Sequence, residues 1–229
     1  MGIVIYSKLE FNGLVFEDKF TALRRSTMRK IGIVLLAIFS FFGAASARDW
    51  DVVAACQNNA GCASCLVSGT KITMSDRKVV AVEKVALNSS VLSPQKSLLQ
   101  LVSLKPNVSF TKNQVSTVAK SKNTRSLYVL IDSKGNSLTA TDHHPIATLN
   151  RGFVQLSNLK VSDVLITLNG NSKVSSVKLS PRKDTHVYNL VVGSTDVSDA
   201  SNHSYFANGI LTGDLYVQAA LFFGYKISF

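Results

Sequence analysis

One cysteine, one Thr-x-x-His pair and one segment near the C-terminus have residue types and an order suited to acyl chemistry. Cys65 is followed at once by a strand-like stretch that contains Gly69 and Thr70. Thr141 precedes His144 by three positions, and a β-type segment with the sequence His-Ser-Tyr-Phe-Ala-Asn-Gly-Ile-Leu follows much later. A thiolate is a strong nucleophile, and histidine exchanges protons near neutral pH. The combination indicates a protein whose substrate is its own peptide bond.

Short β-type segments must hold these residues in place. Many of the segments alternate apolar and polar residues, as half-buried strands do, and Gly, Asn and Ser turns separate them. The spacing predicts an all-β fold with one domain. We expect the polar, basic segment 111–124 to be a mobile loop and the apolar tail 215–229 to be an added strand or a docked tail. The expected strands are 71–74, 78–85, 91–93, 98–104, 126–131, 137–141, 164–167, 173–179, 185–192, 203–207 and 209–211.

The N-terminal region contains the pattern of a secretory signal peptide. A basic region begins at Met28, an apolar core occupies 31–42, and a small-x-small cleavage site follows at 45–47. The core is shorter than the roughly 20 residues that a bilayer crossing needs. We expect 28–47 to be a cleaved signal helix and 1–27 an upstream extension before the true start. The protein is then secreted, extracellular or periplasmic, without a stable membrane span, and is membrane-anchored only if the signal stays uncleaved.

The net charge of +11 does not indicate a nucleic-acid partner. The lysines are scattered, whereas a nucleic-acid surface gathers them in a stripe with aromatic residues. No cofactor and no metal are expected either. Cys62 and Cys65 have the spacing of half a zinc site, but His143 and His144 are adjacent instead of three to five residues apart.

Three cysteines in an exported chain cannot all pair with one another. A disulfide between Cys62 and Cys65 would block the thiol of Cys65, whereas a disulfide between Cys56 and Cys62 would leave that thiol reactive. Both pairings stay open, and redox control of Cys65 follows from the first.

Six blocks in a fixed order resemble the Hint family, the self-processing domains of Hedgehog proteins and inteins. The resemblance covers about 65–214 and implies a single compact, horseshoe-shaped β domain with a pseudo-two-fold axis. It also implies that a short leader, residues 48–64, is the substrate. The blocks are 65–72, 79–93, 141–145, 152–165, 187–190 and 203–211.

The last block departs from the intein pattern. Inteins usually end in His-Asn followed by Cys, Ser or Thr, whereas this sequence has Gly213, Asp214 and Leu215. Because Leu215 cannot accept an acyl group, we do not expect full splicing, although Asp214 stays a candidate for cleaving its own bond. Hedgehog proteins also carry an acid that activates a sterol, and no acid before Thr141 has a recognisable setting for that role. The acids in that interval are Asp76, Glu83 and Asp132.

The resemblance implies a role for each remaining candidate. The Cys65 thiol attacks the Ser64 carbonyl and converts the amide into a thioester, a shift that is uphill unless the amide nitrogen is protonated. His144 is expected to donate that proton, and Thr141 to hydrogen-bond and orient the bond. Asp163 either orients His144 or caps a loop. Water or another small nucleophile then releases the leader.

Two other functions stay open. The order of Cys65, His144 and Asn189 is that of a cysteine hydrolase acting in trans, although the papain-type signature around the nucleophile is absent. The remaining alternative is a non-catalytic secreted β domain for binding or adhesion.

Overall fold

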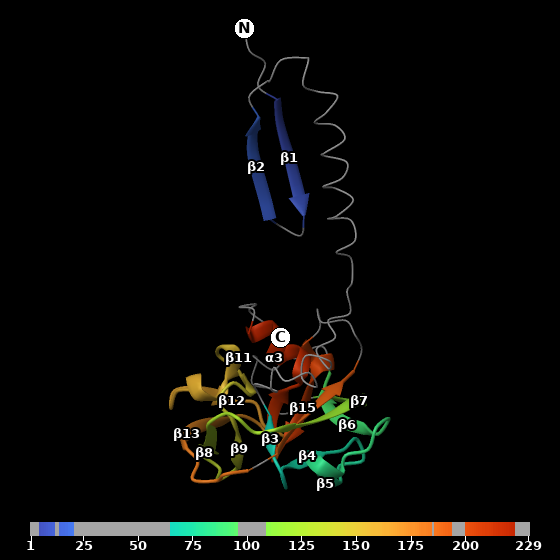
Figure 1. Cartoon of the computed structure of the whole chain (residues 1–229), viewed down its shortest axis with the longest axis vertical. Helices are drawn as coiled ribbons and strands as arrows, with labels where there is room; N and C mark the ends of the chain where they lie inside the picture. Colours follow the sequence, from blue (N-terminus) through green and yellow to red (C-terminus); the bar gives the residue numbers. More distant parts are fainter. Residues whose placement is uncertain are drawn as a thin grey trace. The chain divides into compact units, whose positions relative to one another are not determined.

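A computed structural model describes residues 5–11, 14–20, 65–95, 109–184, 186–193 and 200–222. The chain divides into two compact units, Met1–Trp50 and Asp51–Phe229. In the first unit the described residues form a hairpin in which β1 (Ile5–Phe11) pairs antiparallel with β2 (Leu14–Phe20) (Figure 1). The expected signal helix and leader lie outside the described residues.

The described part of the second unit is built on one antiparallel sheet of 14 strands, which confirms the all-β prediction. The strand order is β5-β4-β15-β16-β10-β12-β13-β8-β9-β3-β14-β7-β6, and β11 pairs with β10. The strands are β3 (Leu66–Val67), β4 (Lys71–Thr73), β5 (Val79–Ala81), β6 (Ser90–Pro94), β7 (Phe110–Lys122), β8 (Leu127–Asp132), β9 (Ser137–Thr141), β10 (Pro145–Thr148), β11 (Gly152–Gln155), β12 (Val164–Leu165), β13 (Ser172–Leu179), β14 (His186–Val192), β15 (Ser204–Ala207) and β16 (Ile210–Gly213). Short 3-10 helices are η1 (Val82–Lys84), η3 (Leu156–Asn158) and η4 (Ala200–His203), and α3 (Leu215–Phe222) is an α-helix.

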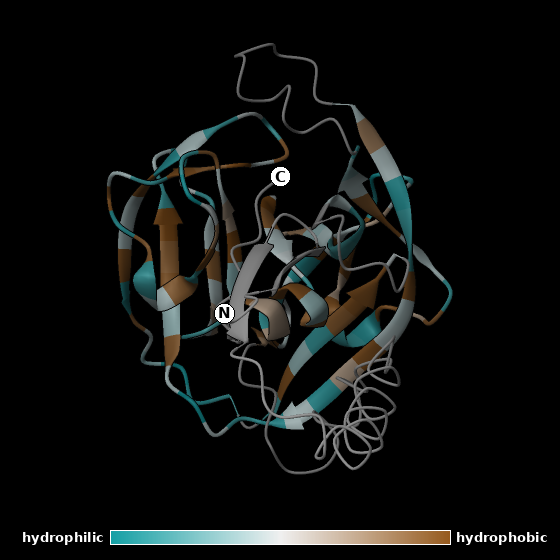
Figure 2. Cartoon of the chain, turned by 90° about the horizontal axis from the view of Figure 1, so that it is seen from above, coloured by the Kyte–Doolittle hydropathy of each residue, from teal (hydrophilic) through white to brown (hydrophobic). Residues whose placement is uncertain are grey.

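The two ends of this strand order come together in space. Met74, directly after β4, forms an antiparallel bridge with Val91 of β6, and Ser93 Oγ donates a hydrogen bond to the Ser204 carbonyl oxygen over 2.7 Å. The sheet therefore curls around a shared interior. Apolar and polar residues alternate along many of its strands (Figure 2), as expected for strands with one buried face. The largest fully buried side chains are Tyr205 and Phe206 of β15.

The prediction of a mobile loop at 111–124 is wrong, because Phe110–Lys122 forms β7, the longest described strand with 13 residues. Few of the inward positions of β7 are strongly apolar, so the periodicity is weak. One of those positions holds Asn113, whose Nδ2 donates a hydrogen bond over 3.1 Å to the buried Ser201 carbonyl oxygen. Pairing with β6 on one side and β14 on the other satisfies the backbone of this polar strand.

Several short or fully buried strands were also not predicted correctly from the sequence. The segment 78–85 forms only β5 before it turns into η1, and β10 and β11 were not expected. Of the strand-like stretch expected directly after Cys65, Leu66–Val67 forms β3. All four residues of β10 are buried, so this strand lacks the alternation by which half-buried strands are recognised. The expected strand at 98–104 lies outside the described residues.

The start of the C-terminal tail is a docked helix, so the alternative of an added strand is wrong. Leu215 and Val217 of α3 are buried, at 1% and 2% exposure, and they pack into two different apolar clusters. Gly213 makes room for this packing, because a Cβ atom there would lie 2.6 Å from Val217 Cγ1. Within the described residues, the structure contains no helix with the length and apolar character to cross a membrane.

The β8–β9 turn depends on a buried carboxylate. Asp132 Oδ1 accepts hydrogen bonds from the backbone nitrogens of Lys134 and Asn136 at 2.9 and 2.8 Å, and Oδ2 accepts one from Asn136 Nδ2 at 2.7 Å. Burial alone would raise the pKa of Asp132, but the hydrogen bonds from Asn136 and Lys134 together lower it below the ordinary 3.8.

We expect Asp132→Ala to reduce the free energy of unfolding by about 2 kcal/mol near neutral pH, because charge-assisted hydrogen bonds are lost. Since the folded-state pKa of Asp132 is lowered, its stabilisation is present above the unfolded pKa of about 4 and is lost as the pH falls through the folded value. The difference between the native chain and Asp132→Asn, measured by urea unfolding, should therefore shrink between about pH 7 and about pH 3. A constant difference would contradict this assignment.

Candidate active site

Cys65 and Thr141 are joined directly, although 76 residues separate them. The backbone nitrogen of Cys65 donates a hydrogen bond to Thr141 Oγ1 over 2.7 Å, and the backbone nitrogen of Thr141 donates one to the Cys65 carbonyl oxygen over 2.9 Å. Leu66, the first residue of β3, pairs with Ala140 of β9 and sets this register. The threonine hydroxyl therefore lies on the nitrogen of the Ser64–Cys65 peptide bond.

A tight turn connects Thr141 to His144. The backbone nitrogen of His144 donates a hydrogen bond to the Thr141 carbonyl oxygen over 3.1 Å, and the His144 carbonyl oxygen accepts one from Leu156 over 2.9 Å. Both Thr141 and His144 are fully buried. Pro145 begins β10 directly afterwards, and its ring fixes the local backbone. Two of the predicted residues are thus held on one short segment at the Cys65 backbone.

The surroundings of the thiol are apolar and closed to solvent. Cys65 is 0% exposed and belongs to a cluster with Leu127 of β8, Val191 of β14 and Leu215 of α3. Ser121 Oγ of β7 lies 4.0 Å from Cys65 Sγ. Residues 56 and 62 lie outside the described residues, so the two disulfide pairings stay predictions.

Asn189 is the next residue in register with Cys65. β14 pairs with β3 through Val187 with Val67 and Tyr188 with Leu66, so the following position on β14 lies opposite the cysteine. The Tyr205 hydroxyl donates a hydrogen bond to Asn189 Oδ1 over 3.2 Å. Asn189 Nδ2 in turn donates one to Gln218 Oε1 of α3 over 3.1 Å.

This amide network links β14, β15 and α3 beside Cys65. Burial raises the pKa of the Tyr205 hydroxyl, and the charge of Asp214 raises it further, so Tyr205 stays neutral and acts as a donor. The sequence contained one signal for this network, the Val-Tyr-Asn-Leu block at 187–190. We interpreted this block as a strand, as one of the Hint-like blocks and, through Asn189, as an alternative triad member, and the network itself was not predicted.

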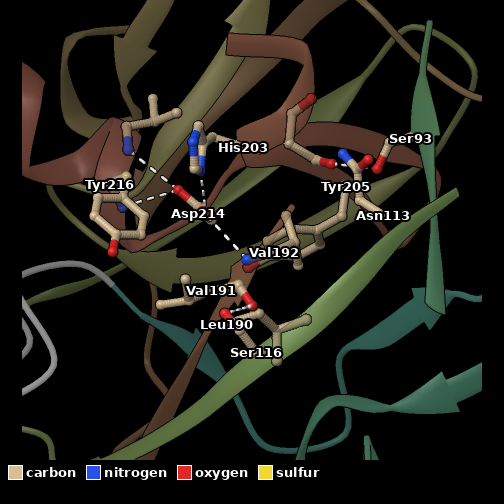
Figure 3. Close-up of polar contacts among 12 residues, drawn as sticks. Ser93, Asn113, Ser116, Leu190, Val191, Val192, His203, Tyr205, Asp214 and Tyr216 are labelled. Carbon is tan, nitrogen blue, oxygen red and sulfur yellow. Dashed lines mark hydrogen bonds and ion pairs between the residues drawn. The ribbon is translucent and has the colours of Figure 1, made fainter. Parts of the chain in front are cut away.

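Asp214 is the N-cap of α3. Its Oδ1 accepts hydrogen bonds from the backbone nitrogens of Tyr216 and Val217 at 2.8 and 3.2 Å, and its Oδ2 accepts one from the backbone nitrogen of Val192 at 3.1 Å. His203 Nδ1 lies 3.0 Å from the same Oδ2 (Figure 3). A carboxylate at this position satisfies amide groups that the first turn of a helix leaves open.

The His203–Asp214 pair is almost completely buried, with side-chain exposures of 1% and 0%. Burial raises the pKa of Asp214, while the hydrogen bond and the positive charge of His203 act in the opposite direction. The ring of His203 also packs against Tyr216, with ring centres 5.0 Å apart. The contact between His203 and Asp214 was not predicted from the sequence.

The two ends of the segment 65–214 meet at this site. Leu215 shares an apolar cluster with Cys65, and the Asp214 carboxylate binds the backbone of Val192 at the end of β14, the strand that pairs with β3. Both chain ends of the domain are therefore attached to one strand.

Asp163 occupies the loop-capping position of the two that the sequence left open. Its Oδ2 accepts hydrogen bonds from Arg151 Nη1 at 2.9 Å and from the backbone nitrogen of Lys160 at 2.8 Å. Its Oδ1 accepts one from Asn150 Nδ2 at 3.3 Å. The carboxylate thus fastens the loop between β11 and β12 and is engaged by groups other than His144.

The acids considered for sterol activation also serve turns. Glu83 Oε2 accepts a hydrogen bond from the backbone nitrogen of Gly69 over 2.9 Å, which lowers the pKa of Glu83. Asp76 Oδ1 accepts one from the backbone nitrogen of Lys78 over 3.1 Å, and Asp132 shapes the β8–β9 turn as described above. The described residues thus give these carboxylates structural partners.

Comparison with solved structures identifies the fold. The DnaB intein from Synechocystis sp. PCC 6803 superposes with a TM-score of 0.52 at 16% sequence identity, covering 66% of this chain and 98% of the intein. A bacterial intein-like domain from Clostridium thermocellum gives a TM-score of 0.51 at 24% identity, with 65% and 97% of the two chains covered. No family model and no curated protein matches the sequence. The described part of the chain therefore shares the fold of these intein and intein-like structures, which confirms the fold that the resemblance implied.

Proposed function

We propose that this domain cleaves its own chain between Ser64 and Cys65 by an N–S acyl shift. A thioester forms and is released by water or another nucleophile, without full splicing. The observation that carries the proposal is the 2.7 Å hydrogen bond between the Cys65 backbone nitrogen and Thr141 Oγ1. In this hydrogen bond the Thr141 hydroxyl contacts the Cys65 nitrogen, which is the leaving group of the acyl shift. The turn that begins at Thr141 also carries His144.

The reaction balances without a cofactor. A bond forms between Cys65 Sγ and the Ser64 carbonyl carbon, the bond from that carbon to the Cys65 nitrogen breaks, and the proton of the thiol is replaced by one on the new amine. His144 delivers the proton to the nitrogen, and Thr141 holds the nitrogen in line. The apolar cluster around the thiol excludes water, which protects the thioester from early hydrolysis.

The proposed reaction does not continue to splicing, because Asp214 at the C-terminal end of the domain is engaged in hydrogen bonds. In an intein-like splicing reaction, the last residue of the domain attacks its own carbonyl group. The Asp214 carboxylate instead accepts hydrogen bonds from three backbone nitrogens and contacts His203. Leu215, the next residue, is buried and carries no nucleophile. We therefore assign Asp214 to folding and not to a second cleavage.

Incubation of the chain from residue 48 onward, with and without dithiothreitol, tests the proposal. We expect a cut that the thiol accelerates and that leaves a fragment beginning at Cys65. His144→Ala should slow the cut. A hydrolase acting in trans would leave itself intact and cut added substrates, and a binding module would do neither.

We propose further that the protein is exported and that its leader, residues 48–64, is the cargo of the reaction. The export pattern at 28–47 and the position of the scissile bond support this order of events. N-terminal sequencing of chain collected outside the host cell should give residue 48 before processing and residue 65 after it. Retention of residues 28–47 on the exported chain would indicate a membrane anchor.

Thr141→Val should slow self-cleavage by about a hundredfold or more, because it removes the hydroxyl while keeping the side-chain shape. Thr141→Ser keeps the hydroxyl and should retain most of the rate. The measurement is the cleavage rate at saturating thiol, together with urea unfolding of each variant. Equal rates for the valine and serine variants would contradict the role of Thr141 in the reaction.

A further inference from the structure

A pocket of about 480 Å³ has in its lining Leu127, a member of the apolar cluster that contains Cys65. Its walls come from the end of β7, the start of β8, and the segment that follows β13. The proposed reaction needs a nucleophile to release the thioester, and nothing described so far would select one. The chemistry of this pocket indicates which class of nucleophile it selects.

The lining of the pocket has more positive than negative side chains. Four cationic side chains line it and only one carboxylate does, namely Lys122, Arg125, Arg182 and Lys183 against Asp184. Arg182 is neutralised by Asp184, with Nη2 and Oδ1 2.6 Å apart. Within the described residues Lys122 and Lys183 form no ion pair, so their charges face the solvent of the pocket.

Hydrogen bonds connect the pocket wall to the turn that carries Thr141. Arg125 holds Asp142 through two bonds, Nε to Oδ1 at 2.7 Å and Nη2 to Oδ2 at 3.0 Å, and the Asp142 backbone nitrogen donates to the Ser126 carbonyl oxygen over 3.2 Å. Leu127 lines the pocket, pairs with Thr141 across β8 and β9, and belongs to the apolar cluster of Cys65. Leu127 therefore belongs both to the pocket wall and to the apolar cluster that surrounds Cys65.

We propose that this pocket binds the acceptor of the acyl group and that the acceptor is a small anionic thiol. This inference rests on the proposed function. The acceptor thiolate attacks the thioester carbonyl carbon, the bond from that carbon to Cys65 Sγ breaks, and the Cys65 thiolate takes up the proton that the acceptor thiol gave up. One thioester is exchanged for another, so the step needs no oxidant, reductant or further reactant.

Direct binding tests the pocket without any reaction. The probe is 2-hydroxyethanesulfonate, which has the charge and size of an anionic thiol but no sulfhydryl group, and the protein is the full chain with Cys65→Ala. We expect saturable binding by isothermal titration or NMR, weakened at least about fivefold in a Lys122→Gln/Lys183→Gln variant and at high salt. The matched control, Lys84→Gln/Lys160→Gln, removes two exposed lysines outside the pocket and should bind as the parent does.

Cleavage rates test the acceptor role. With the native full chain, 2-mercaptoethanesulfonate should release the leader about tenfold faster than neutral 2-mercaptoethanol at low ionic strength. The pocket variant should lose that preference and the control variant should keep it. Equal rates with both thiols, together with absent probe binding, would contradict the proposal that the pocket binds the acceptor. The proposal of self-cleavage would remain intact. Probe binding without a cut by either thiol would overturn the acceptor role and the proposed function together.

Discussion

Cys65→Ala should abolish the cut between residues 64 and 65, lowering its rate at least about a thousandfold. The Thr141 hydroxyl accepts a hydrogen bond from the Cys65 backbone nitrogen, so in the proposed reaction it serves the leaving nitrogen and is not the attacking group. Cys65→Ser should retain a slow reaction, because an alcohol is a weaker nucleophile than a thiol at neutral pH. Electrophoresis with mass spectrometry of both fragments measures the effect.

The matched controls for this prediction are Cys56→Ala and Cys62→Ala. If the reactive thiol is that of Cys65, neither control should abolish the cut under reducing conditions. Under oxidising conditions Cys62→Ala should accelerate it if Cys62 pairs with Cys65. A cut that persists in Cys65→Ala would mean that another group, or a contaminating protease, performs the reaction.

Asp214→Ala should lower the free energy of unfolding by about 3–5 kcal/mol, the largest stability effect that we expect. The substitution removes the N-cap of α3 and the partner of Val192 on β14, and it leaves His203 buried without its carboxylate. Helix α3 carries Leu215 into the Cys65 cluster, so the loss should spread to the active site. Urea unfolding followed by circular dichroism measures the change.

The Asp214→Asn variant distinguishes the stability contribution of the helix cap from that of the carboxylate charge. Asparagine is also a good N-cap residue, so this variant should lose less stability than the alanine variant. Asp76→Ala serves as a control, because Asp76 only joins Lys78 at the surface, and it should leave the unfolding midpoint unchanged. Faster chain breakage after residue 214 in the native protein than in Asp214→Asn would contradict the purely structural role.

The alternation of apolar and polar residues along many strands predicted the all-β fold, because this pattern does not depend on distant neighbours. The meeting of Cys65 with Thr141 was implied by the resemblance to the Hint family and not by periodicity. β7 was missed because one of its inward positions holds Asn113, which is tolerated there only because the Ser201 carbonyl oxygen accepts its hydrogen bond. A hydrogen bond between segments so far apart in the chain cannot be predicted from a short stretch of sequence.

The helix cap at Asp214 was missed for two related reasons. Leu215–Phe222 is apolar on nearly all sides, so it lacks the periodicity of an amphipathic helix. The resemblance to inteins also assigned Asp214 the position of the residue that cyclises in inteins, and not that of a helix cap. The contacts of Asp214 with Val192 and His203 join segments 22 and 11 residues away, and the folded sheet alone brings them together.

The most direct test of the acyl shift is the chemical state of the leader when hydroxylamine is added. Hydroxylamine attacks thioesters readily and amides hardly at all, so the proposed mechanism predicts a leader that ends in a hydroxamate on Ser64 and a partner fragment that begins at Cys65. Mass spectrometry of the leader distinguishes this product. A leader with a free carboxylate, released at a rate that hydroxylamine does not change, would contradict a thioester at Cys65.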